Sequence, residues 1–264
     1  MMKTGWFALG RTLYAKSVAA VNMIELNMCG IVTGWVVVAA LMCGIRIAFP
    51  ATPLRHGAVA TAAAFLPYLV VVGLPLVALA WGLRLFPRGA LFDQPSIRLA
   101  QVGCWRRVDC LTARDMSHHG LFGLMASLLI GLLINVPIRT TEFLTAMPAL
   151  GSHAPHWFTG IYMLMLADCA IISSLYLFAF AMALRMHPLF PRFLLLVWGV
   201  DLLAQIGIAK GAALMGAMPH DVQDAMVELL SGNLKKVLIS AAIWLPYLLL
   251  SERVNLTFRH RLPA

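Results

Sequence analysis

Apolar residues in this chain occur in long runs rather than in short alternating stretches. Each run holds roughly 20 mostly apolar residues, the length that crosses the hydrocarbon core of a bilayer as an α-helix. Six such runs predict spans at residues 28–49, 58–86, 120–138, 157–184, 193–215 and 234–250. The pattern therefore predicts an all-α fold, a polytopic helical membrane bundle with six transmembrane helices.

The polar segments divide the chain into four parts: an N-terminal interfacial segment (1–27), a first two-helix hairpin (28–86), a cytoplasmic basic loop (87–118) and a four-helix membrane domain (119–260). Residues 1–27 mix basic with aromatic residues, which is typical of a helix in the membrane interface rather than of a signal peptide. Within the long loop, residues 95–116 show loosely helical spacing of apolar residues. That loop is either a solvated connector or carries a surface helix.

Composition excludes an ordinary soluble domain. Hydrophobic residues make up 61% of the 264 residues, charged residues only 12%, and the mean hydropathy is +0.85. A soluble domain is about half apolar and about a quarter charged. The surplus falls in the spans, so it indicates contact with lipid rather than a larger core.

The net charge of +9 orients the bundle. Lys and Arg are retained on the cytoplasmic side of membrane proteins. With both termini cytoplasmic, 14 of the 20 Lys and Arg fall on that side, leaving Arg46, Arg55, Arg139, Lys210, Lys235 and Lys236. We therefore predict cytoplasmic termini. The basic residues are spread over several loops, so nucleic acid is not a predicted partner.

No catalytic, metal or cofactor motif stands out, and we predict neither an enzyme nor a cofactor. The five cysteines predict no disulfide framework. Histidines on the predicted outer side form only a weak metal-ligand set, because an H-x-x-H pair in a loop is not specific: His56, His153, His156 and His220. Cys104, Cys110, His118 and His119 do not have a usual zinc spacing.

Ionisable residues inside the spans are the best pointers to function, because a charge in the membrane must be paired or hydrated. Asp168 lies in the fourth span, and Asp201, Gln205 and Lys210 lie in the fifth. Helix geometry allows Asp168 to pair with Lys210. These residues predict either a proton or solute path, or a structural ion pair with a second aspartate hydrogen-bonded between helices.

The C-terminal half carries a motif. Phe190-Pro191-Arg192 opens the fifth span, and the chain ends with Trp244-x-Pro246-Tyr247, Ser251, Arg253-Val254 and Thr257-Phe258. Over residues 119–260 this resembles the uncharacterised bacterial inner-membrane proteins grouped as domain of unknown function 2569 (YdgK-like). The resemblance implies a multi-pass protein of the bacterial inner (cytoplasmic) membrane. It supplies no catalytic or binding residues.

The physical chemistry of this motif predicts an anchor at the cytoplasmic boundary, with docking or gating as the alternative. Trp244, Pro246 and Tyr247 lie just inside the last span, and Ser251, Glu252 and Arg253 lie where the apolar residues stop. Trp and Tyr favour the membrane interface. We expect Glu252 to pair with Arg185 or Arg192.

Residues 78–87 resemble residues 179–188, each ending a predicted outer-to-inner helix. Either the first two hairpins are duplicated, or a cytoplasmic helix exit imposes similar residues on both.

Two functions are open at this point. The first is a non-enzymatic accessory or interaction component of the envelope, with a membrane-protein partner or a second copy of the chain. The second is a small solute or proton-coupled transporter that uses Asp168, Asp201 and Lys210. A polar cavity that reaches these residues would favour transport, and a dry, closed bundle would favour interaction.

Overall fold

The computed structural model describes residues 2–50, 58–97, 103–151, 154–216 and 218–264. Its elements in chain order are α1 (Met2–Leu26), α2 (Met28–Ala48), α3 (Ala58–Leu85), β1 (Trp105–Arg107), α4 (Cys110–Asp115), α5 (Leu124–Ala146), α6 (His156–Leu184), α7 (Phe190–Leu214), α8 (His220–Leu250), α9 (Glu252–Arg259) and β2 (Arg261–Pro263). Six of these helices, α2, α3 and α5 to α8, are long and apolar enough to cross a membrane. The prediction of a helical chain with six apolar helices long enough to cross a membrane is confirmed.

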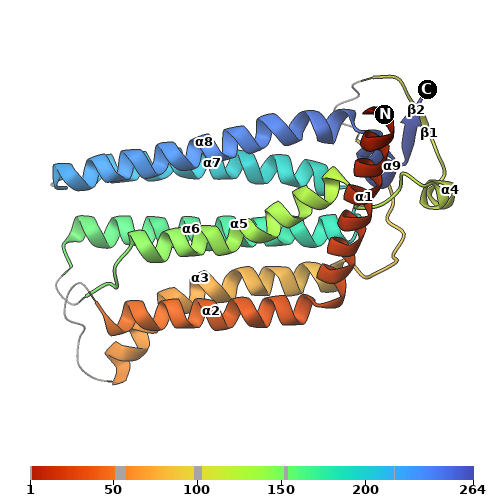
Figure 1. Cartoon of the computed structure of the whole chain (residues 1–264). Coiled ribbons are helices and arrows are strands. Elements are labelled where there is room, and N and C mark those ends of the chain that lie inside the picture. Colours follow the sequence, from red (N-terminus) through yellow and green to blue (C-terminus); the bar gives the residue numbers. More distant parts are fainter. Residues whose placement is uncertain (1, 51–57, 98–102, 152–153, 217) are drawn as a thin grey trace.

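The six long helices run roughly along one axis in layers. Helices α7 and α8 form one layer, α5 and α6 the next, and α2 and α3 the last (Figure 1). Both termini lie at the same end of the bundle, together with α9, β1 and β2, and α1 crosses that end at a steep angle (Figure 1). We call it the terminal end, and the opposite end, where α5 finishes and α8 begins, the loop end. Cytoplasmic exposure of the terminal end stays a prediction.

Two spans are longer than predicted. Helix α5 passes through Pro137 and continues to Ala146, whereas the predicted span stopped at 138. Helix α8 begins at His220, fourteen residues before the predicted start at 234. In both helices a buried stripe at helical spacing continues through the polar residues: Val136, Thr140, Phe143 and Leu144 in α5, and Met226, Leu230, Asn233 and Val237 in α8. Packing against neighbouring helices therefore extends each helix past its polar positions.

The terminal end contains a small sheet that no sequence pattern predicted. Strands β1 and β2 pair antiparallel, with Arg106 opposite Leu262. The surface-helix alternative for residues 95–116 is wrong for most of its described length, which holds β1 and only the short helix α4. Asp109 caps α4 by accepting a hydrogen bond from the amide of Leu111 at 3.1 Å.

Helix α9 joins this sheet to the spanning helices. Its Phe258 ring packs on Phe190 at the start of α7, with ring centroids 5.1 Å apart. The hydroxyl of Thr257 accepts a hydrogen bond from the amide of Gly120 at 3.0 Å, and Asn255 accepts one from the Nε of Arg261 at 2.8 Å. The segment after the last span is therefore packed and buried rather than a loose basic tail.

The two similar segments found in the sequence lie against each other. A Cβ atom at Gly82 of α3 would come within 2.8 Å of the Cβ of Ala181 in α6. Nearby, the rings of Phe86 and Phe178 pack edge to face at 5.7 Å. Small residues at 82 and 181 thus let the two backbones approach closely, as they do in many membrane bundles. Duplication of the hairpins stays a prediction.

Gly82→Ala is expected to lower the free energy of unfolding by about 1–3 kcal/mol, because the added methyl group overpacks the contact with the Cβ of Ala181, which cannot rotate away. The matched control is Gly73→Ala in the same helix, where nothing lies within 4 Å of the added Cβ. Unfolding by denaturant in mixed micelles measures both changes. Equal stabilities of the two variants would contradict the close approach of α3 and α6.

Acid is expected to destabilise the terminal end through His187, whose ring lies between Phe86 and Phe92, with centroids 4.5 Å and 4.6 Å away. Burial lowers the pKa of His187. The unfolded chain therefore binds a proton more readily, and stability present above about pH 6.5 is lost as the pH falls through the lower pKa of the folded state.

The midpoint of unfolding should decrease when the pH is lowered from about 7.5 to about 5. The decrease should be smaller in His187→Phe, which keeps the aromatic packing. His118→Phe, at an exposed position, is the matched control and should keep the wild-type pH dependence. The same slope in His187→Phe and in wild type would show that His187 is not responsible.

Candidate functional site

The centre of the site is Arg139 of α5, which lies between two aspartates. Its Nη1 is 2.8 Å from Oδ2 of Asp168 on α6, and its Nη2 is 2.8 Å from both carboxylate oxygens of Asp201 on α7. The Asp201 side chain is 0% exposed, that of Asp168 5% and that of Arg139 11%. One guanidinium group therefore joins three helices in the interior of the bundle.

Neutral polar side chains complete a network around these charges. Gln205 donates from Nε2 to Asp168 at 3.1 Å and to Asp201 at 3.4 Å. The Tyr176 hydroxyl donates to Asp201 at 3.1 Å, and Asn233 of α8 donates to the Oε1 of Gln205 at 3.3 Å. Helices α5 to α8 each supply at least one member, so the network holds the whole four-helix unit together.

Helical periodicity explains how α7 and α6 present their polar groups. Asp201 and Gln205 are four residues apart in α7, so they lie on one face, together with the buried Val197 and Ile208. Asp168 of α6 lies on the face that also buries Ile172 and Tyr176. The apolar neighbours fix the orientation of both faces and aim the carboxylates at α5.

Two recesses reach the network. The first encloses about 410 Å³ of space, part of it open to the surroundings, and its polar lining includes Asn135, Tyr176, Asp201 and Ser240. The second holds about 280 Å³ of space, also partly open to the surroundings, and its lining includes Met165, Asp168, Cys169 and Leu229. Arg139, Glu142 and Asn233 line both recesses.

The recesses are displaced along the bundle axis. The lining of the first includes Asn135 on α5 and Ser240 on α8, whereas the second reaches Phe143 and Leu229 on the same helices. At the helical rise these positions differ by about 12 Å on α5 and about 16 Å on α8. The recess that contains Asp201 thus extends toward the terminal end, and the one that contains Asp168 toward the loop end.

An ion pair lies beside the first recess. Lys236 of α8 contacts Glu142 of α5, and both side chains are partly exposed. This pair carries no net charge, so Arg139, Asp168 and Asp201 determine the charge of the interior. Among these groups the negative charges outnumber the positive charge by one.

The structure brings three of the four predicted polar residues together and leaves the fourth apart. Asp168, Asp201 and Gln205 lie in one network. Lys210 is exposed on α7, and the partner of Asp168 is Arg139 rather than the expected Lys210. Lys210 lies nine residues, about 13 Å, beyond Asp201 toward the loop end.

Sequence reasoning missed Arg139, Tyr176 and Asn233. The predicted third span ends at 138, one residue before Arg139, because a proline commonly ends a helix, whereas α5 contains Pro137 and continues to Ala146. The signal that could have found it is the apolar spacing of Val136, Phe143 and Leu144, which continues past the proline without a change of phase.

The predicted interfacial motif lies at the terminal end. The rings of Trp244 and Tyr247 pack edge to face at 5.9 Å, and Pro246 lies within α8. Ser251 ends α8 and begins α9, with an extended backbone (φ −65°, ψ 125°). The guanidinium of Arg253 lies 5.8 Å from the centre of the Tyr14 ring. These contacts fix the junction of α8, α9 and α1.

The expected ion pair of Glu252 does not form among the described residues. Arg185 is 3.6 Å from Glu25 of α1, and Arg192 donates to the carbonyl of Ile97. Glu252 is exposed in the first turn of α9. Helix α1 supplies the nearer carboxylate because it crosses the terminal end beside the exit of α6.

The weak histidine set does not form a centre in the described part of the chain. His156 and His220 are exposed at the first residues of α6 and α8. His56 and His153 lie outside the described residues. Within the described ranges, no group of three or more His, Cys, Asp or Glu residues could hold a metal ion.

Comparison with known proteins identifies a family. Residues 118–259, more than half of the chain, match the family described as "Protein of unknown function (DUF2569)". The chain belongs to the DUF2569 family. No curated protein and no solved structure matches the chain. The DUF2569 region contains the whole Arg139–Asp168–Asp201 network and the motif around Trp244, whereas α1, α2, α3 and β1 precede it.

Arg139→Gln is expected to destabilise the protein by about 3–5 kcal/mol, because it leaves two buried carboxylates without their counter-charge. Combining it with Asp201→Asn should restore part of that loss, so the double variant is more stable than additivity allows. Lys210→Gln is the matched control and should change stability by less than about 0.5 kcal/mol. Denaturant unfolding in mixed micelles measures wild type, the two single variants Arg139→Gln and Asp201→Asn, the double variant and the control, and strict additivity would contradict the pairing.

Proposed function

We propose that this DUF2569 protein is a small proton-coupled transporter and that the Arg139–Asp168–Asp201 network is its proton-binding site. The observation that supports this most is the placement of one arginine between two buried aspartates from different helices. Ionisable residues inside membrane bundles commonly mark proton relays and substrate pathways.

The charge balance favours a site that takes up a proton. Arg139 needs only one carboxylate for neutrality, yet it contacts two. With both aspartates ionised, the three groups carry one net negative charge in an interior where charge is costly. A proton on either aspartate removes that charge. A purely structural ion pair would need only one of them.

The two recesses give each aspartate its own approach. Asp201 lies in the recess that extends toward the terminal end, and Asp168 lies in the recess that extends toward the loop end. Gln205 donates to both carboxylates, and Arg139 separates them. A proton that arrives at one aspartate therefore has an acceptor on the other side of Arg139.

This proposal changes the roles assigned from the sequence. Asp168 and Asp201 carry the proton, and Gln205 holds both carboxylates in place by donating a hydrogen bond to each. Arg139 supplies the positive charge that was expected from Lys210. Lys236 and Glu142 form an ion pair in the lining of the first recess. A hydrated solute or proton can enter the recess past this pair. None of these residues is proposed to catalyse a reaction of a substrate.

Proton flux in vesicles tests the proposal. Purified protein is reconstituted with a pH-sensitive dye inside the vesicles, and a potassium diffusion potential drives protons inward. Wild type and the control Lys210→Gln should move protons faster than protein-free vesicles, and Asp201→Asn should fall to the protein-free rate. Infrared difference spectra should show a carboxyl group that titrates in wild type and is lost in Asp201→Asn. Wild-type flux at the protein-free rate, with no titrating carboxyl group, would contradict the proposal.

A second candidate is the accessory or interaction role in the envelope, and the outer face of α2 supports it. Gly30 and Gly34 are exposed and four residues apart, and nothing lies within 4 Å of a Cβ atom added at either position. Small residues at this spacing allow another membrane helix to approach closely. Co-purification from native membrane, compared with Gly34→Ile, tests this role. A partner or second copy retained equally by both proteins would rule out this face.

A further inference from the structure

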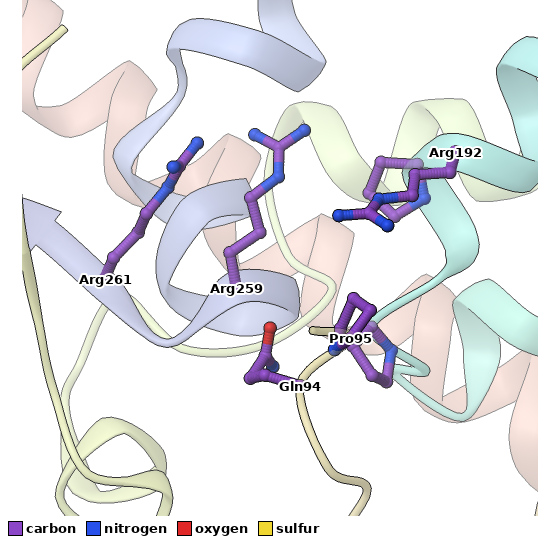
Figure 2. Close-up of a pocket in the computed structure, with 7 residues that line it drawn as sticks. Gln94, Pro95, Arg192, Arg259 and Arg261 are labelled. Atoms are coloured by element: carbon purple, nitrogen blue, oxygen red, sulfur yellow. The ribbon is translucent and has the colours of Figure 1, made fainter. Parts of the chain in front are cut away.

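A pocket at the terminal end gathers three arginines from separate elements. Its lining is Gln94, Pro95, Pro188, Pro191, Arg192, Arg259 and Arg261, and it encloses about 400 Å³ of space, part of it open to solvent (Figure 2). Arg192 comes from the first turn of α7, Arg259 ends α9, and Arg261 begins β2. None of the seven lining residues is acidic.

The backbone between α9 and β2 brings two of these arginines to the same side. His260 adopts the left-handed conformation, with φ 47°, and reverses the chain between Arg259 and Arg261. In Figure 2 the guanidinium group of Arg192 points toward that of Arg259 from the opposite side of the pocket. Residues about 70 positions apart in sequence therefore face one space.

Hydrogen bonds to neutral acceptors orient the Arg259 side chain, and one of these acceptors also contacts Arg261. Arg259 donates from Nη1 to the carbonyl of Leu248 at 3.0 Å and to Oδ1 of Asn255 at 2.9 Å. Arg261 donates from Nε to the same Asn255 oxygen at 2.8 Å and lies 5.2 Å from the centre of the Trp105 ring. Each of these contacts positions a guanidinium group before any ligand arrives.

Arg259 is both buried and close to two other positive charges. Burial, together with the positive charges of Arg261 and Arg192, lowers its pKa to about 10. An anion in the pocket would relieve this repulsion. The planar guanidinium group can donate two parallel hydrogen bonds to the oxygens of a carboxylate or a phosphate, and a phosphate offers more oxygens to arginines that approach from two sides.

We propose that this pocket binds a phosphate group, held by Arg192 and Arg259 from two sides with Arg261 as a third positive charge. The pocket lies beside the first turn of a spanning helix, where the phosphate of a phospholipid headgroup is within reach of the chain. A soluble phosphate has the same chemistry and could approach from the aqueous side. The site does not involve the Arg139 network and stands independently of the transport proposal.

Two binding measurements on the purified full-length protein distinguish these sources. For the soluble source, inorganic phosphate is titrated calorimetrically into protein in detergent. For the lipid source, phosphatidylglycerol retained by the protein is counted by native mass spectrometry, and its affinity is measured with phosphatidylglycerol nanodiscs. The main variant is Arg192→Gln, because Arg192 lies outside the Asn255 contacts that hold α9. The matched control is Arg106→Gln, an exposed arginine of β1 with the same change of charge.

Wild type and Arg106→Gln should bind one probe with equal affinity, and Arg192→Gln should bind it roughly tenfold or more weakly, because charge-assisted hydrogen bonds are lost. Loss for inorganic phosphate indicates a soluble ligand, and loss for phosphatidylglycerol indicates a lipid headgroup. Arg192→Lys keeps the charge but not the paired donors and should also weaken binding; it replaces Arg192→Gln if that variant does not fold. The proposal is overturned if wild type binds neither probe, or if the Arg192 variants bind as tightly as wild type.

Discussion

A charged group in the interior of a membrane bundle must be paired or hydrated, and this requirement organises the bundle around Arg139. Its guanidinium group draws Asp168 and Asp201 from two other helices, and Gln205 and Asn233 extend the contacts to α8. Apolar packing alone leaves helices in lipid free to rotate, because lipid tails are as apolar as the side chains. A directional network with fixed donors and acceptors removes that freedom and sets the rotation of α5, α6, α7 and α8 together.

The two ends of the bundle are held by different means. At the loop end, Arg46 of α2 donates to the carbonyl groups of Leu144 and Thr145, where α5 finishes and leaves its last acceptors open. At the terminal end, α9 packs Phe258 against Phe190 and supplies Asn255 to two arginines. The first hairpin is thus tied to the DUF2569 region by Arg46 at the loop end and by the packing of α3 on α6 at Gly82 and Ala181.

Features that depend on local composition could be predicted from the sequence, whereas features that depend on contacts between distant residues could not. Runs of apolar residues predicted the six spans, and three polar residues of the network were found because charge and amide groups stand out in such runs. Arg139 was missed because Pro137 resembles a helix end, although membrane helices tolerate proline where neighbours satisfy the backbone. Strands β1 and β2 have three residues each and lie about 150 residues apart. Segments this short show no periodicity from which their pairing could be predicted.

The pairing of β1 with β2 can form only late in the synthesis of the chain. Strand β2 is made only after helices α2, α3 and α5 to α8, and β1 cannot pair with it until then. Bringing β1 and β2 together closes a long loop, and the entropic cost of closing a loop grows only slowly with its length. The packed intervening helices reduce this cost because they already hold the two ends of the loop close together. The small sheet therefore joins the connection between α3 and α5 to a segment made after α8, and it can form only when all six long helices of this chain have been made.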